Sequence, residues 1–427
     1  MLFKIALASL INRKLTVFLA IFSIAISIAI VLSVEHIRHQ AKESFANTIS
    51  GTDLIVGARS GRINLLLYSV FRIGNATNNI SWRSYQAIKQ QQEVLWTIPI
   101  SLGDSHKGYR VLGTVNDYFV HYRYRNKNSL SFKNGAEFRG VYDVVLGSAV
   151  AKKLQYEIGQ QIVLAHGVAS VSFVNHDDKP FTIVGILNAT GTPVDKTVHI
   201  SLAGMEAIHL GWRNGVPNPG LKINAQDALN KDLTPKSITA VYLGLKNRIS
   251  TFSVQRRIND TKQEPLMAIL PGVVLSELWQ TMNIIEKILA LIAGLVAATS
   301  LLGMIIMMLS TIKQRDREIA VLRAIGAPAK FIFGLIQLEV IAIVLIGIAL
   351  GISFFWGGML LSEPIISNVY GLTLTTNPFT LATGLYSLII LLVAIIFACL
   401  PAGIVYRQSL RQGLTVNAVS STHLTHP

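Results

Sequence analysis

Four long apolar runs constrain this chain more than any other feature of its sequence. The first, within residues 15–35, spans about 20 residues without charge, enough to cross a hydrocarbon core roughly 30 Å thick. Three further runs lie within residues 284–310, 332–360 and 381–405. A helix satisfies its own backbone hydrogen bonds in lipid. We therefore expect four transmembrane helices.

The basic residues next to these runs predict their orientation. Residues 1–14, 311–331 and 406–427 contain the flanking Lys and Arg residues, whereas 361–380 contain Glu363 but no Lys or Arg. By the positive-inside rule the three basic segments face the cytosol. The short loop and the long segment between the first two runs then face outward, on the periplasmic side.

This orientation gives a full order of segments. The predicted order is a cytosolic amphipathic N-terminus (1–14), transmembrane helix 1 (15–35), a periplasmic domain (36–283), transmembrane helix 2 (284–310), a cytosolic helix (311–331), transmembrane helix 3 (332–360), a periplasmic loop (361–380), transmembrane helix 4 (381–405) and a cytosolic tail (406–427).

The long outer segment shows the mixed pattern of an α+β domain. Asp53–Gly61 is typical of a strand that enters a turn, and residues 144–165 follow a strand–helix–strand pattern. Two subdomains are plausible, one formed from both ends of the segment and one inserted near 110–235. The predicted fold class is an α-helical four-span transmembrane domain with a large α+β periplasmic domain inserted between spans 1 and 2.

Small residues recur at four-residue spacing in the apolar runs, which lets helix backbones approach closely. We favour packing within one four-helix unit over a dimer seam. These positions are Ser23 and Ser27, Gly294 and Ala298, Gly347 and Gly351, and Ala394, Ala398 and Ala402.

Composition and charge exclude several classes of protein. With 51% hydrophobic and 14% charged residues, the chain is too apolar for a soluble protein and too charged for an all-membrane one. The net charge of +15 is spread thinly, with 27 Lys and Arg against 17 Asp and Glu in residues 36–283. A nucleic-acid binder would cluster this charge, so we expect no nucleic-acid partner. Membrane lipids and acidic cargo remain compatible with it.

Catalytic motifs are missing from the sequence. The nearest approach to a P-loop is Gly147–Lys153, which lacks the second glycine in place and the hydroxyl residue after the lysine. There is no HExxH or GxSxG, and Cys399 is the only cysteine. We therefore predict that this chain is no enzyme and holds no cofactor of its own.

The histidines give a weak metal signal. His36 and His39 lie one helical turn apart, and His176 precedes Asp177 and Asp178 in a turn between two predicted strands. Either group could touch a metal, but two ligands without an identified third are a poor basis for a site. We predict no metal site.

An aromatic and basic tract also allows two interpretations. Residues 109–125 contain four tyrosines, Phe119 and three arginines. They could bind extended apolar cargo or nucleic acid. The outward location disfavours nucleic acid, and spacing typical of strands favours a half-buried face of the domain.

The cytosolic segment Lys313–Phe331 combines charge with an apolar stripe. Read as a helix, it places Val321, Leu322 and Ile325 on one broad arc. Gly326 and the proline two residues later predict that this helix stops and a new one starts. The pattern fits either docking on a cytosolic partner or an ordinary amphipathic loop helix.

Two groups of motifs resemble known permeases. REIAVLRAIGA at 317–327, followed by a long apolar helix, resembles the FtsX-like permease domain. DLIVGARSG at 53–61 and VVLGSAVAKKLQYEIGQQIVLAHG at 144–167 resemble the periplasmic core domain of MacB-type permeases. The order of one span, a periplasmic domain and three spans is similar to the MacB, LolC and LolE type of ABC transporter permease over essentially the whole chain.

The resemblance implies a mechanotransmission role in the bacterial inner membrane. A separate ABC ATPase would bind ATP and Mg²⁺, because 14 residues here precede span 1, whereas MacB carries its ATPase on the same chain. Segment 311–331 would be the coupling helix on that ATPase. The implied contact residues are Arg315, Arg317, Glu318, Val321, Leu322, Arg323, Ile325 and Gly326.

The resemblance also implies partners and two rival functions. A second permease copy would complete a homodimer, or a paralogue would complete a heterodimer, and a periplasmic adaptor or lipoprotein is a further candidate partner. The main hypothesis is export or extraction of a substrate on the periplasmic side. The alternative is a non-transporting FtsX-like signalling protein that activates a periplasmic partner such as a cell-wall hydrolase.

Overall fold

The computed structural model describes residues 10–11, 13–167, 176–213, 216–217, 223–314, 321–322, 324–370 and 381–412. The chain divides into two compact units. The helical unit comprises Met1–Arg38, Ile285–Glu363 and Thr375–Pro427, and the sheet unit comprises His39–Ile284 and Pro364–Leu374. Long apolar runs form the helical unit, and strand patterns form the sheet unit.

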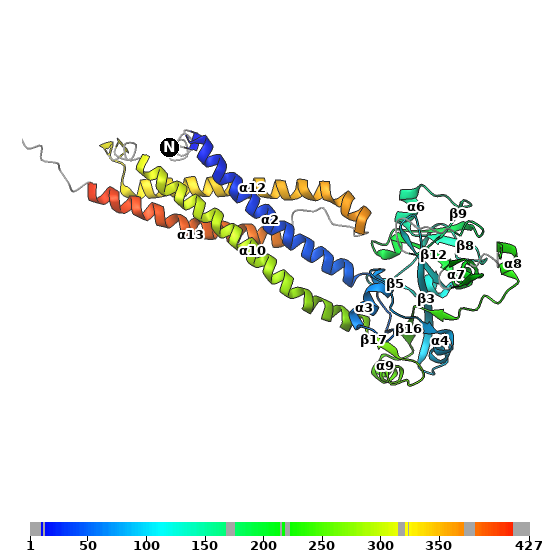
Figure 1. Ribbon diagram of the computed structural model, residues 1–427. Helices are drawn as coiled ribbons and strands as arrows, with labels where there is room; N and C mark the ends of the chain where they lie inside the picture. The colour runs from blue at the N-terminus through cyan, green and yellow to red at the C-terminus, as the bar shows by residue number, and fades with distance from the viewer. Residues whose placement is uncertain are drawn as a thin grey trace, which may run out of the picture. The chain divides into compact units, whose positions relative to one another are not determined.

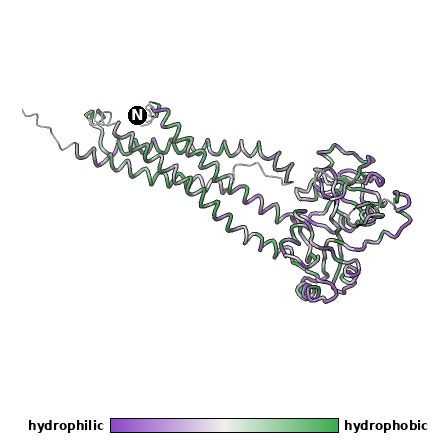
Figure 2. Tube along the Cα trace, in the orientation of Figure 1, coloured by the Kyte–Doolittle hydropathy of each residue, from purple (hydrophilic) through white to green (hydrophobic). Residues whose placement is uncertain are grey.

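Four long apolar helices dominate the helical unit (Figure 1). They are α2 (Lys14–Ala46), α10 (Pro271–Gln314), α12 (Ala329–Tyr370) and α13 (Leu381–Gln412). In the described part of the chain, these four are long and apolar enough to span a membrane. Figure 2 shows hydrophobic residues along each of them. The structure therefore confirms the four predicted helices.

Glycines on α12 allow close contact with α2. A Cβ atom on Gly347 would lie 2.7 Å from Cγ2 of Ile24. One on Gly351 would lie 2.8 Å from the carbonyl oxygen of Ala25 and 2.8 Å from Cβ of Ile28. Only glycine lets the two backbones approach this closely. The predicted use of this pair in packing within the four-helix unit is confirmed.

Serines join α2 to α10. The hydroxyl of Ser300 lies 3.0 Å from the hydroxyl of Ser23 and 2.6 Å from that of Ser27. These bonds satisfy hydroxyl groups that would otherwise be costly in an apolar medium. In contrast, Gly294 and Ala298 line an apolar cavity of about 340 Å³ between α10 and α13. Their spacing does not bring these two helices into close contact there.

The sheet unit is built on an 11-stranded mixed sheet. Nine strands follow the order β17-β1-β16-β3-β4-β12-β8-β11-β7, while β10 pairs with β3 and β9 with β11. The bounds are β1 (Leu54–Ala58), β3 (Val94–His106), β4 (Tyr109–Thr114), β7 (Phe132–Gly135), β8 (Asp143–Leu146), β9 (Gln161–Ile162), β10 (Ala165–His166), β11 (Phe181–Leu187), β12 (Thr197–Ser201), β16 (Ala240–Leu245) and β17 (Leu266–Ile269).

Short helices and two-residue strand pairs complete this unit. The helices are α3 (Arg62–Leu66), the π-helix η1 (Leu67–Phe71), α4 (Trp82–Lys89), α5 (Asp117–His121), α6 (Ser148–Leu154), η2 (Pro193–Lys196), α7 (Leu202–His209), α8 (Ala225–Leu229), η3 (Arg248–Ser250) and α9 (Thr251–Asn259). The strand pairs are β2 (Ile80–Ser81) with β15 (Ser237–Ile238), β5 (Arg123–Tyr124) with β6 (Asn128–Ser129), and β13 (Trp212–Arg213) with β14 (Val216–Pro217).

Strand β3 holds the sheet together. Residues 94–100 pair with β16, and residues 101–106 pair with β4. Strands β1, β16 and β17 come from the two ends of the unit, whereas β4 to β12 come from its middle. The division into two subdomains stays a prediction. Strand β3 pairs with strands of both groups, with β16 from the ends of the unit and with β4 from its middle.

Alternation of side chains gives the sheet an apolar layer on each face. Ile55 and Tyr242 belong to one buried cluster, while their strand neighbours Leu54 and Val241 belong to another. This period of two is the expected signature of a strand buried on both faces. Tyr118 and Tyr122, from the aromatic tract, are also core residues of the first cluster. Two of the tract's four tyrosines are therefore core residues.

Candidate functional site

The structure describes four of the eight predicted contact residues in segment 311–331. Val321 and Leu322 are helical, and the amides of Ile325 and Ala327 donate to their carbonyl oxygens at 3.1 and 3.0 Å. Gly326 then adopts a left-handed φ of +95°, which favours glycine. Helix α12 begins three residues later, so the predicted stop and restart are confirmed.

Two apolar side chains of this segment are exposed. Val321 is 58% exposed and Ile325 is 79% exposed. The other four predicted contact residues, Arg315, Arg317, Glu318 and Arg323, lie outside the described residues. The role of the segment in docking an ATPase stays a prediction.

A second candidate site lies in the sheet unit, where the ends of α2 and α10 pack on its core. The Phe45 ring of α2 lies 4.4 Å from the ring of Phe71, at the end of η1. It also lies 5.7 Å, edge to face, from the ring of Trp279 on α10. We call Phe45, Phe71 and Trp279 the joint. Phe71 is 7% exposed and belongs to the main core cluster, so the joint connects both helix ends to that core.

Backbone contacts fix the end of α2 to the same unit. The hydroxyl of the buried Tyr122 donates to the carbonyl oxygen of Thr48 at 2.6 Å. The amide of Arg125 donates to the carbonyl oxygen of Asn47 at 2.7 Å. These two acceptors lie within two residues of the helix end at Ala46. Displacement of α2 would therefore pull on residues 122–125, which follow α5.

The aromatic contacts of the joint matter more than its ion pair. Arg62 on α3 lies 3.1 Å from Glu277 on α10, but their side chains are 60% and 32% exposed. Exposed ion pairs contribute roughly 0–1 kcal/mol. Aromatic pairs contribute about 0.5–1.5 kcal/mol beyond their buried area, and large side chains dominate packing energetics. Trp279 is therefore a stronger anchor of α10 than the ion pair, alongside Val274, which is buried in the main core cluster.

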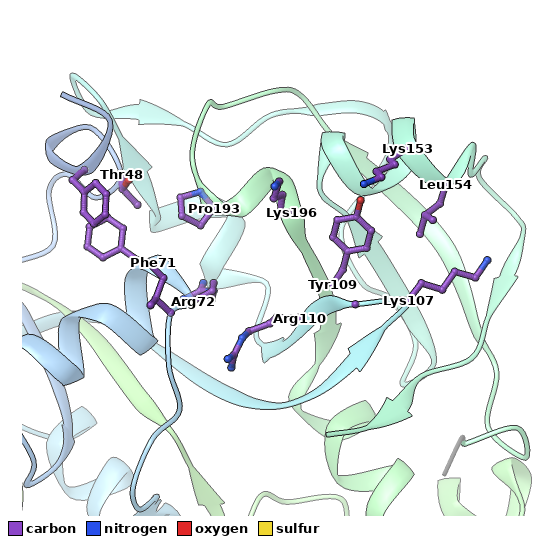
Figure 3. Close-up of a pocket in the computed structure, with 13 residues that line it drawn as sticks. Thr48, Phe71, Arg72, Lys107, Tyr109, Arg110, Lys153, Leu154, Pro193 and Lys196 are labelled. Carbon is purple, nitrogen blue, oxygen red and sulfur yellow. The ribbon is translucent and has the colours of Figure 1, made fainter. Parts of the chain in front are cut away.

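A cavity of about 620 Å³ lies beside the joint (Figure 3). Phe45 and Phe71 of the joint line one part of it, and β4 and η2 contribute to the rest. Figure 3 shows side chains from several elements around this opening. The lining residues are Phe45, Thr48, Phe71, Arg72, Ile73, Lys107, Gly108, Tyr109, Arg110, Lys153, Leu154, Pro193 and Lys196.

Five of these lining residues are basic and none is acidic. Arg72 donates to the hydroxyl of Tyr242 at 3.3 Å, and Arg110 donates to the side-chain oxygen of Asn75 at 3.1 Å. Burial, together with the charge of Lys153, lowers the pKa of Lys196 to about 8. Burial and the charge of Arg72 lower the pKa of Arg110. The cavity thus concentrates positive charge beside apolar walls, a combination that suits an anionic group on an apolar body.

Sequence reasoning found only part of this second site. Tyr109 and Arg110 belonged to the tract that was considered for cargo binding, and both line the cavity. Trp279 precedes the second apolar run, and its position in the sequence does not indicate its contact with Phe45. The sequence does not reveal the joint, because Phe45, Phe71 and Trp279 lie on three separate helices and share no spacing pattern. They meet only in the tertiary structure.

Comparison with known families fits this architecture. Residues 15–261, more than half of the chain, match the MacB-like periplasmic core domain. Residues 290–410 match the FtsX-like permease C-terminal domain. The chain therefore belongs to the MacB/FtsX-type family of ABC transporter permeases. It is a multi-pass membrane protein of that family, as its four apolar helices also indicate.

Two solved structures are similar to part of this chain. One is the periplasmic region of MacB from Actinobacillus actinomycetemcomitans, with 11% identity and a TM-score of 0.33 over 54% of this chain and 94% of that one. The other is the extracellular domain of the noncanonic ABC-type transporter YknZ from Gram-positive bacteria, with 11% identity and a TM-score of 0.30 over 51% and 98%. No curated protein sequence matches the chain.

Proposed function

We propose that this chain is the permease subunit of a mechanotransmission-type ABC transporter in a bacterial inner membrane. A separate ATPase subunit binds ATP and Mg²⁺ on the cytosolic side, and this chain performs no hydrolysis. The sheet unit lies in the periplasm, where its change of conformation exports or extracts a substrate.

The observation that supports this proposal best is the continuity of α2 and α10. Each is one helix that contains a candidate membrane span and continues into residues of the sheet unit. Their far ends reach the joint, where Phe45 and Trp279 pack beside the core residue Phe71. A helix is stiff along its axis, so a shift at one end is carried to the other.

Two contacts would make α2 and α10 move together within the helical unit. Arg38 on α2 lies 2.7 Å from Glu35 and 3.3 Å from Glu286 on α10. The serine contacts at Ser23, Ser27 and Ser300 link the same two helices. We propose that ATP binding displaces this pair of helices as one element.

The cavity beside the joint supplies a candidate contact for cargo. We propose that it receives an anionic group of the substrate, or of a periplasmic adaptor or lipoprotein. Because Phe45 and Phe71 both form the joint and line the cavity, displacement of α2 would reshape the cavity directly. Pairing with a second permease copy, identical or paralogous, is part of the same proposal.

Capture of an ATPase tests the cytosolic half of the proposal. The intact chain in detergent is expected to copurify with an ABC ATPase and to raise its rate of ATP hydrolysis. Glu318→Ala and Arg323→Ala should each reduce capture or stimulation, whereas Lys231→Ala, at an exposed position of the sheet unit, should not. Equal capture and equal stimulation by all variants would exclude residues 315–326 as the coupling segment.

A further inference from the structure

Four side chains of metal-binding chemistry converge in the sheet unit. They are Asp104, His166, His176 and His209, which we call the His–Asp cluster. Each offers one ligand atom, and these four atoms all lie within 4.8 Å of one another. Among the described residues, this is the one group of at least three His, Cys, Asp or Glu residues whose potential ligand atoms lie so close together.

The fold brings these residues together from separate parts of the chain. Asp104 lies on β3 and His166 lies on β10, directly opposite each other in the antiparallel pair. His209 is the last residue of α7. The amide of His176 donates to the carbonyl oxygen of Leu164 at 2.9 Å, which fixes this residue beside β10. The cluster is therefore positioned by backbone pairing and not by one flexible loop.

Three separations among Asp104, His166 and His209 are close to those around a tetrahedral ion, and the atoms of all four residues lie within 4.8 Å of one another. Nδ1 of His166 lies 3.1 Å from Oδ1 of Asp104 and 3.3 Å from Nε2 of His209. Nε2 of His209 lies 3.5 Å from Oδ2 of Asp104. Ligands about 2.0–2.1 Å from a tetrahedral Zn²⁺ are separated by roughly 3.3 Å.

The orientation of His209 suits coordination. Its Nδ1 lies 2.9 Å from the carbonyl oxygen of Met205, which accepts the ring proton there. In the neutral ring the opposite nitrogen, Nε2, carries the lone pair, and it lies beside Asp104 and His166. Ligating histidines generally donate their second N–H to such an acceptor, which sets the tautomer and the ring orientation.

Two members of the cluster are buried without sufficient hydrogen bonds. Asp104 is 1% exposed and His176 is 0% exposed. Oδ2 of Asp104 and both ring nitrogens of His176 make no hydrogen bond to any residue that the structure describes. Buried polar atoms normally have a partner, so each exception requires an explanation.

Aromatic rings, and not hydrogen-bonding groups, surround His176 among the described residues. The Trp212 ring, 4.5 Å from that of His176 and 4.9 Å from that of His166, gives the cluster an aromatic wall. A buried imidazole whose two nitrogens have no hydrogen-bond partner among the described residues is well suited to a metal ion and poorly suited to a hydrogen-bonded core.

We propose that the His–Asp cluster binds one divalent transition-metal ion of the Zn²⁺ class. Three imidazoles and one carboxylate are borderline ligands, which suit Zn²⁺ better than Mg²⁺ or Ca²⁺. Four protein ligands close a tetrahedral shell, as in structural sites, and leave no position for a reacting water. The ion would tie β3, β10 and the end of α7 to the segment at His176.

The two histidine groups visible in the sequence differ from this cluster. His39 lies 3.8 Å from Glu43 on the exposed side of α2, and His36 packs 5.4 Å from the ring of Phe355. Asp178 forms an ion pair with Lys179 at 2.8 Å. Of the two histidine groups considered, only His176 joins the cluster. Its partners are 72, 10 and 33 residues away in the chain, so no motif spacing reveals them.

Metal content and a cobalt spectrum test the proposal. The full-length chain would be purified through a tag without histidine, stripped with EDTA, dialysed against Zn²⁺ and measured by elemental analysis. We expect one Zn²⁺ per chain. Replacement with Co²⁺ should give the intense visible absorption of a four-coordinate ion with nitrogen and oxygen ligands.

Matched variants assign the ligands. Asp104→Asn, which preserves side-chain shape, and His176→Ala should each weaken Zn²⁺ affinity by at least about 100-fold, since even loss of an outer partner costs about 10- to 100-fold. His39→Ala should keep the full metal content. Absence of bound Zn²⁺ in the unsubstituted chain, a six-coordinate Co²⁺ spectrum, or unchanged affinity in both ligand variants would overturn the proposal.

Discussion

Lys196 illustrates at the scale of one residue how the fold changes side-chain chemistry. Its pKa of about 8, lowered by burial and by Lys153, makes its charge sensitive to pH just above neutrality. The protonated form prevails below pH 8 and the neutral form above it. No sequence pattern predicts this, because Lys153 lies on α6 and Lys196 on η2.

This titration predicts a pH-dependent affinity of the cavity for anions. Hexyl sulfate, whose own charge does not change with pH, should bind the protein in nanodiscs about tenfold more weakly once Lys196 is neutral, the size expected for one charged hydrogen bond. Calorimetric titration from pH 6 to pH 10 would measure the change. Lys196→Met should bind weakly throughout, and the exposed Lys262→Met should follow the unsubstituted protein. Identical pH profiles for all three would refute the assignment.

Other residues could be predicted from the sequence because their role is local. Gly326 and the proline after it mark the turn before α12, and glycine tolerates the φ of +95° found there. The four ligands of the His–Asp cluster could not be predicted in this way. They meet only after β3, β10 and α7 are assembled, so the information lies in tertiary pairing.

At the scale of elements, the long helices were the most predictable part of the molecule. Uninterrupted apolar runs determine them. Small-residue spacing predicted packing within the four-helix unit, and Gly347 and Gly351 on α12 pack in this way against α2. The joint was not predictable, because aromatic residues are common near the ends of membrane helices and in domain cores alike. Only the contact between Phe45, Phe71 and Trp279 distinguishes this use.

The contact between α2 and α12 gives a test with an internal control on one helix. Gly351→Ala would place a methyl group 2.8 Å from the carbonyl oxygen of Ala25, whereas Gly358→Ala would meet no atom within 4 Å. Both changes raise helix propensity equally. We expect Gly351→Ala to destabilise the helical unit by about 1–3 kcal/mol, as overpacking does, and Gly358→Ala to leave it unchanged or slightly more stable.

Thermal unfolding in detergent, followed by fluorescence, would compare the two variants. Equal melting temperatures for Gly351→Ala and Gly358→Ala would mean that α2 and α12 do not pack closely at this position. A loss confined to Gly351→Ala would support the described contact.

For the whole molecule, the sequence predicted the arrangement of parts better than their connections. A four-span permease with an α+β domain between spans 1 and 2 follows from hydropathy, charge and motif resemblance, and the family matches agree with it. In the proposed mechanism, the physical link from ATP hydrolysis to the sheet unit depends on the joint. We therefore expect Trp279→Ala to separate ATP hydrolysis from the response of the sheet unit, because the end of α10 loses its main aromatic anchor.

Hydrogen–deuterium exchange of the complex with its ATPase tests that link most directly. With ATP and vanadate, exchange should change in peptides that cover residues 40–48, 67–73 and 271–281, as well as in the cytosolic segment. In Trp279→Ala the changes in the sheet unit should disappear while ATP hydrolysis continues, and Phe252→Ala, at an exposed position of α9, should behave as the unsubstituted protein. Nucleotide-dependent changes confined to the cytosolic segments of the unsubstituted protein would contradict mechanical transmission through α2 and α10.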